Sequence, residues 1–131
     1  MPHASFVPLR IFSCYTMLEG AIDPAEIATR ARAHGFPAAA ICDRNGLYGA
    51  MPFSDASKKA GVQPIIGTLL AVARPAPDSS RRASLDWLAL YAQNAHGYDN
   101  LCALVSAAHL ARPLDMDAHV DFALLARHAE G

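Results

Sequence analysis

The chain has 131 residues, of which 53% are hydrophobic and 18% are charged, and its 11 basic and 12 acidic side chains leave a formal net charge of −1. A nearly neutral protein creates no field that attracts a polyphosphate backbone, which argues against a self-sufficient nucleic-acid binder. No uninterrupted apolar run of about 18 residues occurs, which argues against a transmembrane helix. The length suits one compact domain with a core, and the first residues lack the pattern of a signal peptide, so a cytoplasmic location is expected.

The three cysteines, Cys14, Cys42 and Cys102, are widely spaced. An odd number of cysteines without a signal peptide argues against a disulfide framework. The absence of a C-x-x-C pair argues against a cysteine-rich zinc site. We therefore expect three reduced thiols that pack as small buried apolar residues.

The first elements in chain order are a strand and a helix. Residues 6–12 are predicted to form a strand, and Pro8 favours an edge position for it. A helix begins after Asp23, which can cap it, and Glu26 three residues later completes a pattern similar to a capping box. Gly35 is the expected left-handed residue that ends this helix.

A second strand–helix–strand unit follows. Residues 37–42 form a short continuous apolar run that is typical of a strand buried on both faces, and residues 43–46 are predicted to form a turn. A helix is predicted over residues 50–60 with Gly61 as its stop, before a strong strand over residues 62–72. This alternation with short connections predicts a parallel α/β sheet.

The second half of the chain begins with a polar loop over residues 74–84, whose Arg81–Arg82 pair is interpreted as solvated rather than as a phosphate contact. Residues 85–92 are predicted to form a fourth strand, followed by a helix that opens at residues 96–100 and a short helix at residues 121–128. Four strands cannot close a barrel, so we expect part of a larger structure whose exposed edges something must cover.

Catalytic groups of parallel α/β folds gather at the carboxyl ends of the strands. These ends supply the candidate site residues Arg10, Phe12, Ser13, Cys14, Tyr15, Glu19, Asp43, Arg44, Asn45, Thr68, Asp86 and Trp87. Of these, only Glu19, Asp43 and Asp86 are carboxylates suited to a hydrolytic metal centre, and none belongs to a recognisable ligand pair. The six histidines are interpreted as solvated or helix-end residues, and Cys14 lacks a histidine base.

The pair Asp43–Arg44 is the most suggestive of these candidates. The simplest interpretation is a turn residue followed by an exposed arginine. The alternatives are a structural ion pair, or a phosphate contact through Arg44.

Three motifs occur in order: Y-T-M-L-E-G-A from residue 15, D-R-N-G-L-Y-G-A from residue 43 and K-K-A-G-V-Q-P-I-I-G from residue 58. Together they resemble the N-terminal PHP (polymerase and histidinol phosphatase) domain of bacterial DNA polymerase III alpha subunits. The resemblance covers almost the whole chain from Phe6. It implies that residues 1–131 are the N-terminal portion of a PHP-type distorted βα barrel, without the polymerase palm, fingers and later domains.

The chain departs from the metal-binding members of this family. The positions that correspond to their metal site hold Arg10, Phe12, Asp43, Arg44, Leu69 and Trp87. Only Asp43 is a metal-ligand type, because arginine stays protonated. We therefore expect no bound metal and no catalytic residue, and we hypothesise that Arg10 and Arg44 replace the metal cations and pair with Asp43.

The resemblance also implies a parent DNA-directed DNA polymerase, a nucleotidyltransferase of DNA replication that uses Mg²⁺ in a region absent here. This portion is expected to be structural and to need no cofactor. Its expected partners are the rest of the alpha subunit, the proofreading exonuclease subunit and other replicase subunits, with DNA reached through the parent, no membrane, and possible self-association through open sheet edges.

Two alternatives remain. One is the error-prone alpha-subunit paralogue of translesion synthesis, whose second motif often reads as Asp43–Arg44–Asn45 does. The stretches over residues 17–21 and 59–67 are more similar to the replicative form. The other alternative is a metal-dependent phosphoesterase or 3′–5′ exonuclease of the PHP superfamily.

Overall fold

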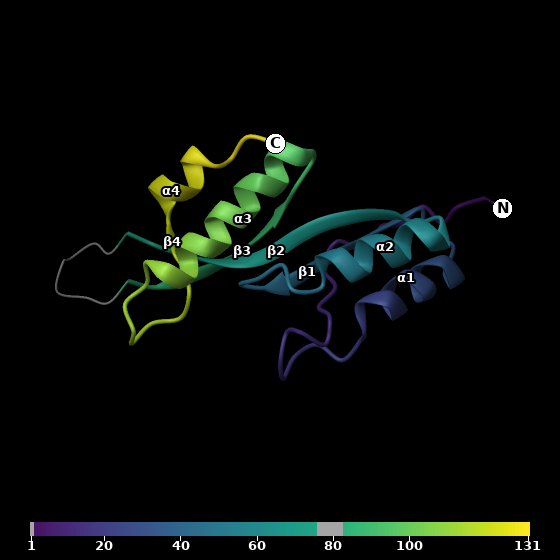
Figure 1. Cartoon of the computed structure of the whole chain (residues 1–131), viewed down its shortest axis with the longest axis horizontal. Coiled ribbons are helices and arrows are strands. Elements are labelled where there is room, and N and C mark those ends of the chain that lie inside the picture. Colours follow the sequence, from purple (N-terminus) through teal and green to yellow (C-terminus); the bar gives the residue numbers. More distant parts are fainter. Residues whose placement is uncertain (1, 76–82) are drawn as a thin grey trace.

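The computed structural model describes residues 2–75 and 83–131. In chain order the elements are α1 (Pro24–Ala33), β1 (Ala38–Arg44), α2 (Ala50–Ala60), β2 (Gln63–Ala73), β3 (Leu85–Tyr91), α3 (Ala95–Leu110), β4 (Val120–Asp121) and α4 (Phe122–Arg127) (Figure 1). The predicted Arg81–Arg82 pair lies outside the described residues. No helix in the described part of the chain is long and apolar enough to cross a bilayer.

β2 is the central strand of the sheet. It pairs in parallel with β1 along one edge, antiparallel with β3 along the other, and at its end in parallel with the short β4. The predicted parallel arrangement is confirmed for β1 and β2, which α2 connects. It is wrong for β3, which follows β2 in the chain and pairs antiparallel with it as a hairpin. A parallel strand needs a longer crossover, usually a helix, than the residues between Ala73 and Leu85 supply.

The predicted helix ends are confirmed. The Asp23 carboxylate accepts a hydrogen bond from the Ala25 amide at 2.9 Å, and α1 ends before Gly35, which has a φ of +71°. Glu26 does not complete a capping box, because its carboxylate binds Arg30 one turn later at 2.6 Å. The start and end of α1 and the end of α2 at Gly61, which has a φ of +71°, therefore lie where local capping chemistry predicts.

The predicted first strand is wrong. Residues 6–12 form an extended segment that contacts β1 through a single bridge. The Ala40 and Cys42 amides, two residues apart, donate to the carbonyls of Pro8 and Ile11, which are three residues apart. The extra residue interrupts the ladder, and Pro8 has no N–H to donate, so the segment stays at the edge.

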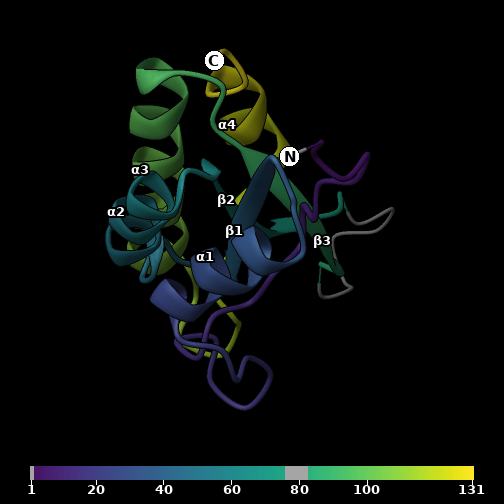
Figure 2. The ribbon, with the colours of Figure 1, turned by 90° about the vertical axis from the view of Figure 1, so that its right-hand side faces the viewer.

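The core consists of two clusters on one face of the sheet. The first joins α1, β1 and α2 through Ile27, Ala31, Ala39, Ile41, Phe53 and Val62. The second joins β2, α3 and β4 through Leu70, Val72, Leu104, Ala108, Ala118 and Val120. Ile41 lies beside Ile66, so both clusters use the same side of the pleat, and Figure 2 shows α2 and α3 on that side.

The opposite face carries the even-numbered residues of β1 and the odd-numbered residues of β2 and β3. It includes Cys42, Arg44, Leu69, Ala71 and Trp87. Three of the six positions that the resemblance assigns to a metal site, Arg44, Leu69 and Trp87, therefore lie on a face against which no described helix packs.

The hairpin has a direct spectroscopic test. Ala71 and Trp87 are register partners, as are Leu69 and Ala89, and they occupy positions where antiparallel strands approach to about 4.5 Å between Cα atoms. We predict Hα–Hα nuclear Overhauser contacts for both pairs in the NMR spectrum of the protein. Their absence, with contacts typical of parallel strands instead, would contradict the hairpin.

Candidate functional site

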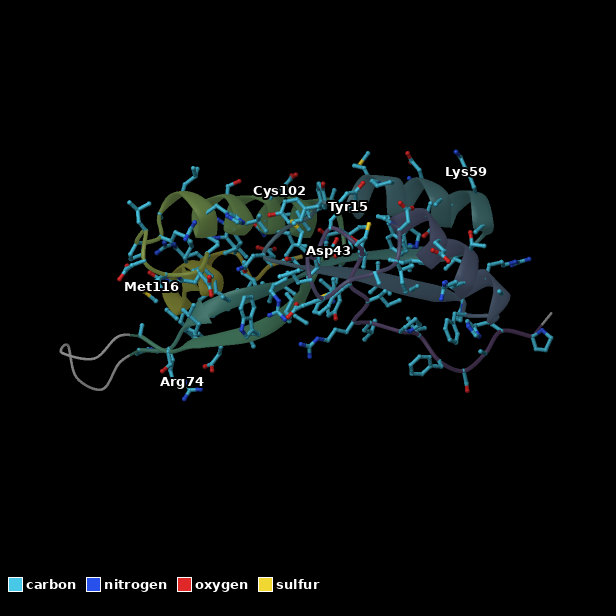
Figure 3. The ribbon with its side chains drawn as sticks, turned by 90° about the horizontal axis from the view of Figure 1, so that it is seen from below. Tyr15, Asp43, Lys59, Arg74, Cys102 and Met116 are labelled. Atoms are coloured by element: carbon cyan, nitrogen blue, oxygen red, sulfur yellow. The ribbon has the colours of Figure 1, made fainter. Side chains whose placement is uncertain are left out.

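A buried carboxylate organises the carboxyl end of β1. Asp43, which Figure 3 labels, is 1% exposed. Its two oxygens accept three hydrogen bonds. The Ser13 amide donates at 2.7 Å, the Ser13 hydroxyl at 2.8 Å and the Thr16 hydroxyl at 2.8 Å. Hydrogen bonds to an ionised acceptor are among the strongest in proteins, so Asp43 holds the loop that contains both residues against the sheet.

The loop over residues 13–20 has a fixed shape. The Gly20 amide donates to the Thr16 carbonyl at 2.8 Å, and a Cβ at Gly20 would lie 1.8 Å from the Ser13 carbonyl oxygen. Leu18 has a φ of +69° and is fully exposed. The turn therefore requires glycine at position 20, and it presents Glu19 to the sheet.

Arg44 lies on the face of the sheet against which no described helix packs. Its guanidinium donates to both carboxylate oxygens of Glu19, at 2.8 and 3.0 Å. The guanidinium carbon also lies 4.3 Å from the centroid of the Trp87 ring and 5.5 Å from that of Phe12. A cation in this position is stabilised by one carboxylate and by the faces of two aromatic rings.

The predicted pairing of the arginines with Asp43 is wrong. Successive side chains of a strand point to opposite faces. Asp43 therefore points to the side of the sheet that carries the helices, and Arg44 points to the opposite side. Glu19 is the partner of Arg44 instead. Within the described part of the chain, Arg10 forms no salt bridge with Asp43.

The other predicted residues fall into two groups. Thr68 joins the site, since its hydroxyl donates to the Asp43 carbonyl at 2.9 Å. Asn45 bridges neighbouring segments, because its side chain accepts from the Ala71 amide and donates to the Ala118 carbonyl. Asp86 does not join the site: on the antiparallel β3 it lies near the hairpin end, where it pairs with Arg74 at 2.7 Å.

An open groove of about 800 Å³ adjoins this cluster. Cys14 and Tyr15 line it, as does His109, whose Nε2 lies 2.7 Å from the Asn45 carbonyl oxygen. His109 is exposed in the last turn of α3, which agrees with its interpretation as a solvated or helix-end residue, whereas Thr16 was not among the predicted site residues. Only the place of Thr16 inside the first motif could have indicated its role.

Neither the Cys42 thiol nor the Tyr91 phenol is an activated nucleophile. Burial raises the pKa of the Cys42 thiol. Burial also raises the pKa of Tyr91 to about 12, and its hydroxyl donates to the Leu9 carbonyl at 2.5 Å. All three cysteines are free, but only Cys42 is fully buried, so the prediction of burial is wrong for the exposed Cys14 and only partly met by Cys102.

Residues 8–131 match the PHP domain family. The chain belongs to this family. It is 42% identical over 127 residues to a DNA polymerase III subunit alpha of Caulobacter vibrioides, a match that covers 96% of this chain and 11% of the relative. It is also 42% identical over 110 residues to an error-prone DNA polymerase of Anaeromyxobacter sp. strain K, a match that covers 83% of this chain and 9% of the relative.

This PHP chain thus spans about a tenth of the length of these relatives. A solved structure of a putative metal-dependent phosphoesterase from Bifidobacterium adolescentis shares the fold, with a TM-score of 0.53 at 18% identity. That match covers 86% of this chain and 36% of the phosphoesterase. The PHP resemblance and the α/β fold class are confirmed, and the sheet of the described residues is an open part of such a fold.

The residues of this PHP domain do not fit a metal ion. In the part of the chain that the structure describes, no group of three or more His, Cys, Asp or Glu side chains is placed to hold one. Arg44, which lies over the Trp87 ring, cannot act as a ligand because it stays protonated. Leu69 is buried and apolar, and Asp43 has committed both oxygens to Ser13 and Thr16.

We predict that Asp43→Ala destabilises the protein by about 3 kcal/mol or more, because three donors lose their acceptor and two of them are buried hydroxyls. Asp86→Ala is the matched control: its carboxylate is exposed and paired with Arg74, so a much smaller loss is expected. Urea unfolding of both variants measures the difference. Equal losses would contradict the role assigned to Asp43.

We predict that Arg44→Lys costs about 1–2 kcal/mol, because an ammonium loses both the bidentate bond to Glu19 and the stacking on Trp87. Arg30→Lys is the control, because Arg30 forms an exposed pair with Glu26 within one helix and should lose about 0.5 kcal/mol or less. Fluorescence of Trp87, the single tryptophan, follows the unfolding. If Arg44→Lys loses no more unfolding free energy than Arg30→Lys, the contacts of Arg44 with Glu19 and Trp87 do not stabilise the fold.

Proposed function

We propose that this chain is the N-terminal portion of the PHP domain of a replicative DNA polymerase III alpha subunit, where it acts as a structural and partner-binding element without catalysis of its own. One observation carries the proposal. The position of a metal-binding histidine in active relatives holds Arg44, whose charge is satisfied by Glu19 and by the rings of Trp87 and Phe12.

The proposal makes Arg44 an internal cation that replaces the metal. A metal ion in such a site ties the strand ends and the first loop together through shared ligands. Arg44 provides a similar tie with its own contacts, since it joins β1 to the 13–20 loop through Glu19 and to β3 through Trp87. Because the tie needs no cofactor, the domain stays folded without one.

The parent protein would carry the chemistry. Relatives that this chain matches over 83–96% of its length are named DNA polymerases, and they are about ten times longer. We assign the parent template-directed addition of deoxynucleotides with Mg²⁺, in the cytoplasm, by a region outside these residues. The proposed partners of this portion are the rest of the alpha subunit, the proofreading exonuclease subunit and other replicase subunits, with DNA contacted by the parent.

The error-prone paralogue is a second candidate, because error-prone DNA polymerases reach the same 42% identity. The segment of the reading frame that encodes the palm and clamp-binding regions distinguishes the two. The phosphoesterase or exonuclease alternative rests on the fold of the Bifidobacterium relative, and the absence of a ligand set in the described residues weighs against it.

Metal analysis tests the proposal. The purified chain, incubated with Zn²⁺ or Mn²⁺ and desalted, is expected to retain far less than one ion per chain, and its melting temperature is expected to be unaffected by EDTA, since no ion binds the native state. The Bifidobacterium phosphoesterase serves as the positive control in the same protocol. Stoichiometric metal, or hydrolysis of a phosphoester above background, would overturn the assignment of a non-catalytic domain.

A further inference from the structure

Residues 4–12 form a strap that lies beside β1, and Figure 2 shows it, in purple, on the side of the sheet away from α2 and α3. The Ala40 amide donates to the Pro8 carbonyl at 2.9 Å, and the Cys42 amide donates to the Ile11 carbonyl at 2.8 Å. The extra strap residue between these two bonds interrupts the ladder, whereas β1 pairs with β2 in an unbroken register. The strap is therefore joined to β1 less regularly than β1 is joined to β2.

The two ends of the strap are held differently. Ser13, directly after it, is fully buried, and its amide and hydroxyl donate to the Asp43 carboxylate at 2.7 and 2.8 Å. Near the other end, the Ala4 amide donates to the carbonyl of Gly35, which follows α1 and does not belong to the sheet. Ser13 is therefore the fixed point of the strap.

A tyrosine of β3 reaches across the sheet to the middle of the strap. The Tyr91 hydroxyl donates to the Leu9 carbonyl at 2.5 Å, although β1 and β2 lie between β3 and the strap. Cys42, Gly67 and Tyr91 are register partners in one row of the sheet. A Cβ at Gly67 would lie 2.5 Å from Cδ1 of the Tyr91 ring. The ring therefore crosses β2 at a glycine, whose lack of a side chain leaves room for it.

The Tyr91 hydroxyl also lies beside a buried thiol. Burial raises the pKa of Cys42, whereas a hydrogen bond with Tyr91 and the charge of Arg10 act in the opposite direction, so both groups lie close to the sulfur. Burial raises the pKa of Tyr91 to about 12. The phenol therefore keeps its proton, and its bond to Leu9, throughout the physiological pH range.

We propose that the Tyr91 hydroxyl is a latch for the strap, and that its release lets residues 4–12 move away about Ser13 while the sheet and the helices stay folded. Openings of this kind, confined to a weakly held segment, need less free energy than global unfolding. The latch differs from the hydrogen bonds to β1 because it comes from a strand on the far side of β2. It therefore couples the position of the strap to that of β3.

Opening of the strap has two consequences for the sheet. It uncovers the Cys42 thiol and removes the acceptors of the Ala40 and Cys42 amides. It also carries away Arg10, one of the six positions that the resemblance assigns to a metal site. The inference goes beyond the proposed function, because neither Tyr91 nor Leu9 belongs to those positions.

Native-state hydrogen exchange of Tyr91→Phe tests the latch, because this variant keeps the ring over β2 and loses only the hydroxyl. The amides of Ala40 and Cys42, which donate to the strap, are expected to exchange about fivefold faster than in the unaltered protein. The Asn45 amide, which donates to β2, should exchange at an unchanged rate. Unchanged exchange at Ala40 and Cys42, equal acceleration at Asn45, or global unfolding of the variant would overturn the proposal.

Tyr98→Phe is the matched control, because Tyr98 is a partly buried tyrosine on α3. The same loss of a hydroxyl there should leave the exchange of the Ala40 and Cys42 amides unchanged. If Tyr98→Phe accelerates both amides as much as Tyr91→Phe does, the bond to Leu9 is not the latch.

Labelling of the cysteines with N-ethylmaleimide gives a second readout, followed by mass mapping of the peptides. Cys42 is expected to react about fivefold faster in Tyr91→Phe than in the unaltered protein, whereas the exposed Cys14 should react at the same rate in both. Loss of the hydrogen bond from Tyr91 by itself raises the pKa of Cys42 and slows the reaction, so a faster reaction reports access to the thiol. A Cys42 rate that is unchanged or lower in Tyr91→Phe would contradict the opening of the strap.

Discussion

The buried carboxylate of Asp43 is the interaction on which the site depends. Its bonds to Ser13 and Thr16 hold the 13–20 loop in one shape. That shape places Glu19 where it can meet Arg44, and Arg44 in turn lies against Trp87 on β3. A single buried acceptor thus sets the geometry of contacts that extend across three segments of the chain, because each contact restricts the next.

The alternation of side chains along β1 separates two kinds of chemistry. Residues that point toward the helices, including Ile41 and Asp43, belong to the core and to the support of the loop. Cys42 and Arg44 point the other way, to the face against which no described helix packs. This face carries Arg44, Leu69 and Trp87, three of the six positions that the family resemblance assigns to a metal site, whereas the core residues of β1 lie on the other face.

Much of the fold was predictable from local sequence. The capping residue Asp23 and the left-handed Gly35 and Gly61 locate helix ends because their chemistry acts within a few residues. The irregular pairing of residues 6–12 was not predictable, since the apolar residues of this segment fit a strand but its hydrogen bonds depend on their spacing against β1. The antiparallel direction of β3 was likewise not predictable, because it depends on the pairing of β3 with β2 and not on the sequence of β3 itself.

The sequence by itself determined the family and the places of α1, β1, α2 and β2 along the chain. These features rest on motifs and on short-range periodicity. Only the tertiary structure decided that Arg44 pairs with Glu19 rather than with Asp43, that Trp87 lies over its guanidinium, and that Asp86 lies elsewhere. Those outcomes depend on strand direction and on which face a residue occupies, and both are fixed by contacts between segments that are distant in the chain.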